Sequence, residues 1–590
     1  MLCCYVLVLL ASFVYKPKWK IPKTEATIGW DVSGYYWYLP GLFIYDDLQE
    51  QQWRDTIHDL YNPDAHQDQS YQYDEGIYVN KYSCGMALQY LPAFAAAHLY
   101  ATNSHFPADG FSTPYQLAIQ IWSVLYCLLG LFLMRRVLLL HFTDKVAALT
   151  LLLVVFGTNY LNSAAIDSAM SHNYLCTLYA ALILLSRRYY RGPTIWLAAG
   201  IGLVLGIMAL SRPTEILAAI IPLTYGIQLT NKESLKDRLS FINSHYHQYI
   251  TAVLLVVAVG SIQLLYWHHA TGSWLVYSYR DQGFSWLAPH FILYNFSYAS
   301  GWLTYTPLML FAVAGLIAFT VRHRQHEGLL LFFGLFWYVT CAWDYWNYGG
   351  RAMVQSYAVL VVGLAYMLQF VAKDRGRRSV CTVVCMALVY YNLWWTHGIH
   401  KGKYTNAYTN TKSYFWRTLG RWDFPVRTLE LLDTEYLFEG EEENLRQLAV
   451  NDFDYLSDSL YKSWYFGEDG YDFVNQDRKY SDIIEYELPT IDTDWYRVQA
   501  QIFRKQKEYI IWKQPVLAWA GYTDNEQKLY FAIRLDRTVD GGQNMLRWID
   551  VPAHVLKKHR INKIRGFLIH SGSIKPTLID DLAILAFDEK

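Results

Sequence analysis

The chain has 590 residues, of which 53% are hydrophobic, 17% aromatic and 17% charged. A soluble domain usually carries about 25% charged residues, so this composition excludes a simple soluble enzyme and a disordered chain. The formal net charge of −1 gives no overall positive field to attract polyanions, and we expect no nucleic acid among the partners. Residues 1–400 are apolar runs with short polar loops, whereas residues 401–590 are rich in charged side chains.

Eleven apolar runs in the first 400 residues predict membrane-spanning helices. A bilayer core needs about 20 apolar residues per helical span, and packed positions accept slightly shorter runs. The runs are 2–15, 114–134, 146–160, 171–186, 194–211, 213–229, 248–267, 302–321, 328–343, 352–372 and 379–395. We therefore predict a polytopic α-helical membrane protein of about eleven spans, with the lipid bilayer as a partner.

Basic residues in alternate loops predict the sidedness of these spans. They gather at 135–136, 187–191, 232–238, 322–324 and 373–378. The positive-inside rule makes these loops cytoplasmic, so the long loop 16–113 and the tail after residue 395 face outward. Lys16, Lys18, Lys20 and Lys23 oppose this arrangement, because they fall on the outer side. A further span at 83–101 would move them inside, although Pro92 favours a helix on the membrane surface there.

The polar tail predicts a separate β domain. Apolar and polar residues alternate at 495–503, 528–535, 564–570 and 578–587, with turn residues at 523–525, 540–542 and 571–572, which indicates a β-sandwich. Residues 448–590 resemble jelly-roll domains of the carbohydrate-binding type, and such a domain either binds sugar or only caps an enzyme. We expect a partly helical linker over 401–447, amphipathic near 426–450.

Several charged residues in the predicted outer loops are candidates for chemistry. Asp31 follows the first span, where a carboxylate can take a proton from a hydroxyl; a helix N-cap is the alternative. Lys81 lies between aromatic residues before an apolar segment, which suits a phosphate at the membrane plane, or simply a lysine that reaches to the interface. An arginine such as Arg351, near the hydrocarbon edge, requires an anion or a partner, for which Asp344 is available.

The predicted outer loops therefore bring an acid, several cations and many aromatic rings to one membrane face. A phosphate-linked sugar would use all three: the acid deprotonates an acceptor hydroxyl, the cations neutralise the leaving phosphate, and the aromatic faces stack on the sugar. A structural pair with Glu215 is the alternative for Arg212, and a helix cap is the alternative for Ser171 in the segment 167–173.

The order of these motifs resembles the GT-C superfamily of integral-membrane glycosyltransferases, which contains protein O-mannosyltransferases and the aminoarabinose transferase of lipid A. The resemblance covers about residues 1–395 and rests on Asp31, on the element 81–92, and on the segments 159–174, 278–286, 301–308 and 343–351. It implies an inverting glycosyltransferase of the bacterial inner membrane, with the C-terminal domain in the periplasm. The implied donor is a polyprenyl-phosphate-linked sugar, and the acceptor is a glycan, a lipid or a protein.

The resemblance also implies roles for particular residues. Asp31 would be the catalytic base, and Lys81 and Arg351 would hold the lipid phosphate. The further substrate-binding candidates are Tyr82, Asp167, His172, Arg212, Arg280 and Asp344. We find no convincing Asp-x-Asp pair in an outer loop, so we expect no obligate metal ion and no other cofactor.

Two other classes of function remain open. A glycolipid transporter or flippase is one, although the predicted spans are almost free of charge and no internal repeat is visible. A non-catalytic envelope protein whose jelly roll binds glycans is the other.

Overall fold

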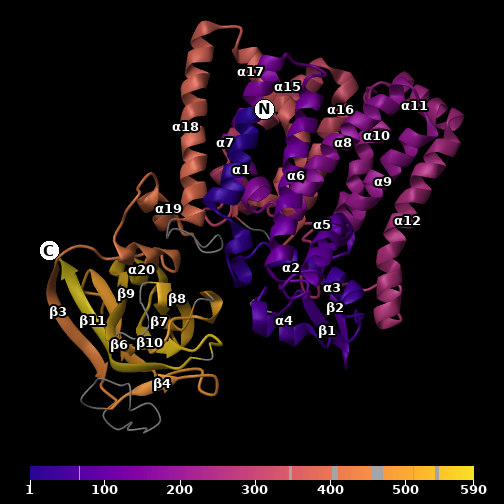
Figure 1. Cartoon of the computed structure of the whole chain (residues 1–590). Coiled ribbons are helices and arrows are strands. Elements are labelled where there is room, and N and C mark those ends of the chain that lie inside the picture. The colour runs from indigo at the N-terminus through magenta and orange to yellow at the C-terminus, as the bar shows by residue number, and fades with distance from the viewer. Residues whose placement is uncertain are drawn as a thin grey trace. The chain divides into compact units, whose positions relative to one another are not determined.

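The computed structural model describes residues 1–64, 67–344, 348–401, 410–453, 470–508, 511–537, 544–573 and 575–590. The chain divides into two compact units, Met1–Lys401 and Gly402–Lys590. The first unit is mainly helical, and the second is built on antiparallel sheets (Figure 1).

Long apolar helices dominate the first unit. Five segments of the described residues are long and apolar enough to cross a membrane: Leu2–Lys20, α6 (Thr113–Leu138), α12 (Tyr246–Thr271), Gly349–Val371 and α18 (Arg375–His400). The first contains α1 (Leu2–Leu10) and the fourth contains α17 (Tyr357–Val371). The remaining helices of the bundle are α7 (Asp144–Gly157), α8 (Ser171–Arg191), α9 (Ile195–Ser211), α10 (Ile220–Thr224), α15 (Leu308–Arg322) and α16 (Glu327–Ala342).

The prediction of eleven spans is therefore not confirmed, although every one of the eleven runs contains helix. The run 302–321 is interrupted, because α14 (Trp302–Tyr305) ends before Pro307, which has no N–H to continue a helix. The run 213–229 is helical only as far as Thr224. Helix α7 has 14 residues, or about 21 Å at 1.5 Å per residue, against a hydrocarbon core of about 30 Å.

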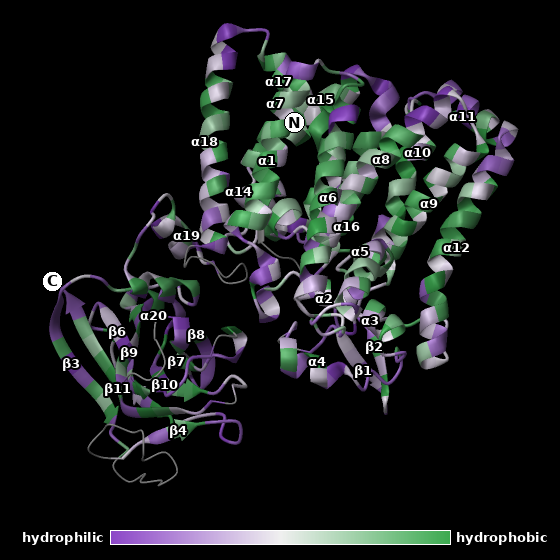
Figure 2. Ribbon diagram, in the orientation of Figure 1, coloured by the Kyte–Doolittle hydropathy of each residue, from purple (hydrophilic) through white to green (hydrophobic). Residues whose placement is uncertain are grey.

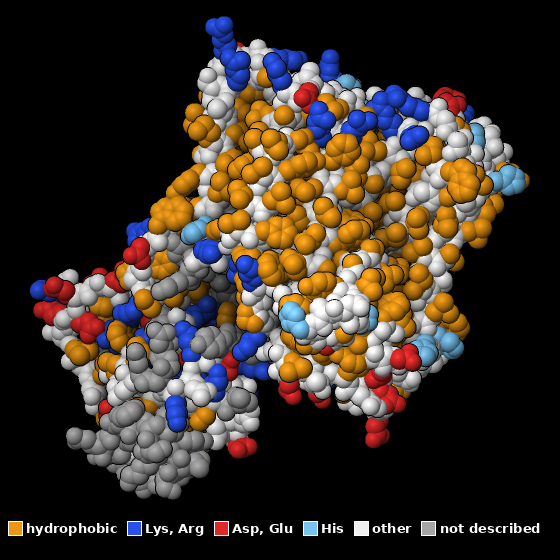
Figure 3. Space-filling view, viewed as in Figure 1, with side chains coloured by type: hydrophobic (Ala, Val, Ile, Leu, Met, Phe, Trp, Pro, Cys, Tyr) orange, Lys and Arg blue, Asp and Glu red, His pale blue; other side chains and the backbone are white. Residues whose placement is uncertain are grey.

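The surface of the helical unit is apolar around its middle. Figure 2 shows hydrophobic residues along the helices and hydrophilic residues near their ends, and in Figure 3 hydrophobic side chains form a broad band across the visible face. Three apolar side chains of α12, namely Val253, Leu254 and Val257, are each at least 60% exposed. Such a surface is expected where lipid replaces water around the protein. The helical unit is therefore built as a membrane protein.

The loop 16–113 folds into a layer of short elements beside the bundle. They are α2 (Asp31–Tyr36), α3 (Tyr38–Phe43), α4 (Arg54–Tyr61), the antiparallel hairpin of β1 (Ser70–Asp74) and β2 (Ile77–Asn80), and α5 (Gly85–Thr102). Fully buried aromatic residues such as Tyr36, Tyr90 and Tyr115 form its core. The segment predicted as a surface helix is α5, and it lies outside the five candidate spans. The large loop is thus an ordered scaffold.

The remaining elements of the unit connect the helices. Helix α11 (Lys232–Ser244) follows α10, and α13 (Phe291–Phe296) lies in the loop after α12. The 3₁₀ helices include η2 (Lys18–Lys20), η5 (Pro213–Ala219), η6 (Arg324–His326) and η7 (Tyr348–Ser356), and η4 (Leu161–Ile166) is a π-helix.

The second unit is a sandwich of two antiparallel sheets. One sheet has the order β5-β10-β7-β8, and the other has the order β3-β11-β6-β9, with β4 paired to β11. The strands are β3 (Glu442–Asn451), β4 (Asp472–Val474), β5 (Ile484–Glu487), β6 (Trp495–Phe503), β7 (Val516–Thr523), β8 (Glu526–Arg534), β9 (Asn544–Pro552), β10 (Lys563–Ile569) and β11 (Thr577–Glu589). Val498 and Ile584 of one sheet and Trp519 and Ile564 of the other share one buried core.

The alternating pattern located four strands, but the expected start of the domain lies inside another strand. Strands β6, β8, β10 and β11 match the four predicted segments, although β8 and β10 each end one residue before the predicted end. Asp524 and Asn525 of the first predicted turn have positive φ. The boundary at residue 448 falls within β3, and the amphipathic segment 426–450 is η8 (Val426–Leu432) followed by strand rather than one helix. The predicted turn at 540–542 lies outside the described residues.

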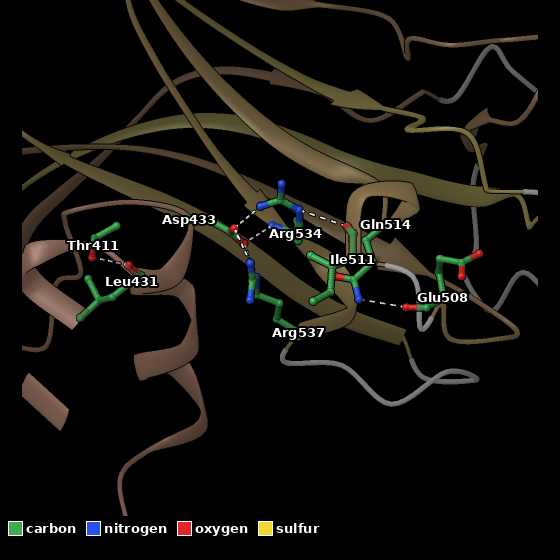
Figure 4. Close-up of polar contacts among 8 residues, drawn as sticks. All are labelled: Thr411, Leu431, Asp433, Glu508, Ile511, Gln514, Arg534 and Arg537. Atoms are coloured by element: carbon green, nitrogen blue, oxygen red, sulfur yellow. Dashed lines mark hydrogen bonds and ion pairs between the residues drawn. The ribbon is translucent and has the colours of Figure 1, made fainter. Parts of the chain in front are cut away.

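Asp433 attaches the segment before β3 to the sandwich (Figure 4). Its carboxylate accepts hydrogen bonds from the Arg534 backbone N–H at 2.9 Å and from Arg537 Nε at 2.9 Å, and a further one from the Arg534 guanidinium. Thr411, just before α19 (Lys412–Thr418), donates its hydroxyl to the carbonyl oxygen of Leu431 at 2.5 Å. The described part of the expected linker is therefore packed as part of the second unit.

Candidate functional site

The site begins with an ion pair between residues 320 positions apart. Arg351 Nη2 donates a hydrogen bond to Asp31 Oδ2 at 2.5 Å. Asp31 is the first residue of α2, and Arg351 belongs to η7. Their side chains are 22% and 32% exposed, so the pair is accessible to a ligand. Two sequence-predicted site residues thus meet directly.

The residue before Asp31 has a strained backbone conformation, which fixes the position of Asp31. Trp30 before it has φ 48° and ψ −131°, a conformation that costs a bulky residue about 1–3 kcal/mol unless its surroundings hold it. The Trp30 N–H donates to the Pro63 carbonyl oxygen at 2.9 Å, and the Ser33 hydroxyl donates to the Trp30 carbonyl oxygen at 2.7 Å. Trp30 is the N-cap of α2, so the alternative prediction of Asp31 as a helix cap is wrong.

Two glycines directly before Arg351 set the position of that arginine. Gly349 and Gly350 have φ of 59° and 58°, which side chains with a Cβ adopt only under strain. A Cβ on Gly350 would lie 2.6 Å from the Trp302 Cβ atom. Asn159 Nδ2 donates to the Gly349 carbonyl oxygen at 2.7 Å and fixes the turn. Glycine is therefore favoured at position 350 by the close approach to Trp302, and at position 349 by its positive φ alone.

A second ion pair joins Lys18 and Asp167. Lys18 Nζ lies 2.8 Å from Asp167 Oδ1, and the two side chains are 18% and 28% exposed. Burial acts to raise the pKa of the Asp167 carboxyl, but the Lys18 ammonium and the neighbouring His400 and Arg351 outweigh it, and the net pKa lies below the usual value. Asp167 is therefore an anion at neutral pH.

A third group surrounds His172 at the start of α8. His172 Nδ1 lies 2.9 Å from Gln355 Nε2 and 3.5 Å from Arg212 Nη1. Both of these nitrogens are donors, so Nδ1 is the acceptor and the neutral ring carries its proton on Nε2. Tyr179 donates its hydroxyl to the Glu215 carboxylate nearby on η5. The carboxylate and the arginine of the 211–215 segment are thus both engaged inside the protein.

Three tyrosine side chains, Tyr35, Tyr82 and Tyr279, lie near Asp31. The Tyr35 and Tyr82 ring centroids are 4.5 Å apart, and those of Tyr82 and Tyr279 are 5.8 Å apart. Burial raises the pKa of Tyr82 well above its ordinary value, and the Asp31 charge raises it further. Tyr82 therefore stays a neutral phenol that can donate a hydrogen bond. Sugar rings pack well on such faces.

We call Lys18, Asp31, Asp167, His172, Arg212 and Arg351, with Tyr35 and Tyr82, the Asp31 cluster. The charge of Arg351 acts on Lys18, Asp167, His172, Arg212 and both tyrosines. The three cations Lys18, Arg212 and Arg351 face the carboxylates of Asp31 and Asp167, and the nearby Glu215 also acts on Arg212. Arg212 and Arg351 are guanidinium groups, whose several N–H donors can bind a further anionic group beside their present partners.

The other predicted site residues lie at the edge of the cluster or away from it. Lys81 pairs with Asp68 at 3.6 Å and lies 5.7 Å from the Tyr82 ring. Arg280 lies 4.0 Å over the Tyr71 ring.

Asp344 accepts from Ser285 Oγ at 2.6 Å and from His290 Nε2 at 3.0 Å, and these bonds lower the pKa of its carboxyl. The expected pairing of Asp344 with Arg351 is wrong, because Arg351 pairs with Asp31.

The sequence did not point to Lys18, Tyr35, Tyr279 or Gln355 as site residues. Lys18 carried one usable signal, because it belongs to the lysines that oppose the positive-inside pattern, and a cation on the wrong side can be held there by an acid. Tyr35 is one of many tyrosines in the first outer loop, and only the fold distinguishes it.

No protein-family model and no curated protein sequence matches this chain. Within the described ranges, no three His, Cys, Asp or Glu side chains are grouped so that they could hold a metal ion. What the site can do is therefore argued from its ion pairs and aromatic rings.

Proposed function

We propose that the helical unit is a GT-C-type glycosyltransferase that moves a sugar from a polyprenyl-phosphate donor to an acceptor hydroxyl, with inversion at the anomeric carbon. The observation that carries the proposal is the 2.5 Å contact between Asp31 and Arg351, inside a cluster that also holds two further cations and two tyrosine rings. A carboxylate and a cation at one point suit a reaction that removes a proton while a phosphate leaves.

Asp31 has one oxygen available for this proton. Arg351 engages Oδ2, and within the described residues Oδ1 accepts no hydrogen bond. The acceptor hydroxyl oxygen attacks the anomeric carbon while its proton passes to Asp31. The bond from that carbon to the phosphate oxygen breaks, and its electron pair stays on the phosphate. Attack opposite the leaving group inverts the anomeric carbon and needs one carboxylate only.

The cations neutralise the charge that develops on the phosphate. Arg351 has five N–H donors, so it can hold Asp31 and a phosphate oxygen together. Arg212 and Lys18 are close enough to Arg351 for its charge to act on both of them, so all three cations can act on one phosphate. Electrostatic stabilisation of a leaving group is often the largest single contribution to catalysis.

The position of the basic residues supports an outward-facing site. The basic segment 373–378 lies at the N-terminal end of α18. His400, at the other end of this helix, has its Nε2 atom 2.5 Å from Asn162 Oδ1, beside the cluster. By the positive-inside rule we place the cluster and the chain after His400 on the outer side of the membrane. The resemblance to GT-C enzymes implies that this side is the periplasm of a bacterial inner membrane. The strand orders β3-β11-β6-β9 and β5-β10-β7-β8 support a jelly roll for that domain.

The test is sugar transfer by purified protein in lipid nanodiscs, with a panel of radiolabelled polyprenyl-phosphate sugars. Asp31→Asn removes the base without changing side-chain size, and we expect the rate to fall by about 10²–10⁴-fold. Asp144→Asn is the matched control, because Asp144 is 68% exposed and pairs with Arg135, away from the cluster. We expect it to keep the full rate.

Three outcomes would count against the proposal. Unchanged transfer in folded Asp31→Asn protein would reject Asp31 as the base. Equal losses in Asp31→Asn and Asp144→Asn would show that the assay reports stability. Movement of intact labelled glycolipid across vesicles, with no transfer to any acceptor, would indicate a transporter.

A further inference from the structure

The helical unit holds a second group of cations, at the other end of α8 from His172. A cavity of about 640 Å³ lies among the end of α8, the turn after α10, α11 and η6. Its basic and acidic lining residues are Arg187, Arg191, Arg238, His141, His326 and Asp237. At 1.5 Å per residue, Arg187 is about 22 Å along α8 from His172. The cavity is therefore separate from the Asp31 cluster.

Arg238 is held in place but has an unused donor. Its guanidinium lies 3.7 Å over the Tyr190 ring, and Nη2 donates to the Tyr225 carbonyl oxygen. Nη1 is buried and donates no hydrogen bond to any described residue. A buried charged donor without an acceptor is costly, and a bound anion removes that cost.

The cavity has more positive charge than the protein neutralises. In the part of the chain that the structure describes, Arg187, Arg191 and Arg238 form no ion pair. Asp237 is the only acid among the described lining residues, so three arginines against one aspartate leave a formal excess of two positive charges. Arg135 and Arg324, which do not line the cavity, are by contrast paired, with Asp144 and Glu327.

His326 adds a neutral hydrogen-bond donor to the lining of the cavity. It is 8% exposed, and its ring lies 4.7 Å from that of His141, nearly perpendicular to it. Burial lowers the pKa of His326 to about 4, with further contributions from His141, His323 and Arg187. At neutral pH the ring is uncharged and offers one N–H without adding to the repulsion among the arginines.

Helix α11 places the cavity at a membrane boundary. Leu235 and Leu239, one helical turn apart, are 37% and 67% exposed, whereas Lys232 and Lys236 occupy neighbouring positions. Exposed apolar and basic side chains on one short helix are typical of helices that lie among lipid headgroups. Figure 3 shows Lys and Arg side chains gathered at this end of the unit.

We propose that this cavity binds a phosphate group at the membrane surface, carried by an anionic lipid headgroup or by a small soluble phosphate. The three arginines supply charge-assisted hydrogen bonds to its oxygens, and the apolar side chains of Leu140, Ile227 and Phe241 in the same wall pack against the carbon atoms beside it. The inference stands on this cavity alone and does not depend on sugar transfer.

The test is calorimetric titration of the full-length protein in a non-ionic detergent with three probes. Dioctanoyl-phosphatidylglycerol carries phosphate and chains, glycerol 3-phosphate carries phosphate only, and dioctanoylglycerol carries chains only. We expect saturable binding of the lipid phosphate, weakened about tenfold for each arginine removed in Arg187→Gln/Arg191→Gln. Arg188→Gln is the matched control, because Arg188 is exposed on the same turn and does not line the cavity.

Each outcome decides the proposal. Arginine-dependent binding of phosphatidylglycerol alone supports a lipid headgroup, and arginine-dependent binding of glycerol 3-phosphate as well supports recognition of phosphate itself. Absence of binding by both phosphate probes overturns the proposal, as does equal affinity in Arg188→Gln and the double variant. If the double variant fails to fold, Arg191→Gln alone replaces it, because Arg191 is exposed at the end of α8.

Discussion

Single side chains show that the two carboxylates of the Asp31 cluster have different partners. Asp31 meets a guanidinium, whose planar donors can bind a second anion at the same time, whereas Asp167 meets the compact ammonium of Lys18. The Lys18–Asp167 pair also joins two distant parts of the chain, 149 residues apart. We therefore infer that Lys18 and Asp167 mainly hold the site together, whereas Asp31 and Arg351 have the arrangement that the proposed transfer reaction needs.

Removing one member of the Lys18–Asp167 pair tests this assignment. Surface pairs contribute about 0–1 kcal/mol, and disruption of buried pairs costs about 3–5 kcal/mol. With exposures of 18% and 28%, we expect Lys18→Met to lower the free energy of unfolding by about 2 kcal/mol. Thermal unfolding in detergent, with Asp167→Asn and the double variant, gives the coupling energy. Lys20→Met is the control, since Lys20 is exposed; additive losses would show that the pair is not coupled.

The protonation of a single side chain, His326, tests whether that ring is buried and neutral in the folded protein. Its pKa in the folded protein is about 4, and about 6.5 when unfolded. The unfolded chain therefore binds more protons between pH 6.5 and 4, and stability falls as the pH drops through that window, by up to about 3 kcal/mol. We expect His326→Gln to flatten the dependence of the melting temperature on pH. His247→Gln, at an exposed position, should leave it unchanged; an unaltered slope in His326→Gln would contradict the buried neutral ring.

At the scale of elements, apolar runs predicted helices but not their lengths. The run 114–134 became α6, because nothing in it interrupts a helix. Pro307 divides the run 302–321, and the helical segment formed by η5 and then α10 ends at Thr224, where the chain turns. The alternation of apolar and polar residues predicted both ends of β6 correctly, because one face of that strand is fully buried and the other is only partly buried.

The candidate site was predictable only in part, because its contacts join residues that are far apart in the sequence. Local sequence identified Asp31 and Arg351 as unusual charges, yet their contact spans 320 residues and depends on how the helices pack. From the sequence we therefore expected Asp344 to be the partner of Arg351, because the two residues lie seven positions apart in the chain. No local pattern reveals that the Gly349–Gly350 turn directs the arginine toward α2 instead.

That turn supplies a prediction for the element η7. Both glycines have positive φ, but a Cβ would lie 2.6 Å from Trp302 Cβ at Gly350, and no nearer than 3.5 Å to any atom at Gly349. We expect Gly349→Ala to cost about 1 kcal/mol from backbone strain alone. Gly350→Ala should cost clearly more and also lower the transfer rate, because the clash moves Arg351. Melting temperatures and transfer rates of the two variants check this; equal effects would show that the contact with Trp302 does not position Arg351.

At the scale of the whole molecule, each unit has its own means of stability. The helical unit exposes apolar side chains suited to lipid, whereas the second unit buries a core formed by residues of its two sheets. That second core includes a fully buried Arg504–Asp536 ion pair. Since these contacts lie within Gly402–Lys590, we expect a fragment of residues 402–590 to fold without the membrane helices.

Asp433 gives this expectation a quantitative test. Its side chain is 2% exposed, and Arg537, at 7%, has its Nε atom 2.9 Å from it. Asp433→Ala leaves the buried Arg537 without this carboxylate, so we expect the fragment to lose about 3 kcal/mol of unfolding free energy in urea. Asp492→Ala should lose at most about 0.5 kcal/mol, because Asp492 and its partner Arg446 are 56% and 49% exposed. If both variants unfold at the same urea concentration, Asp433 does not join the segment before β3 to the sandwich. That segment would then be a linker, as the sequence predicted, and the sandwich would be stable without it.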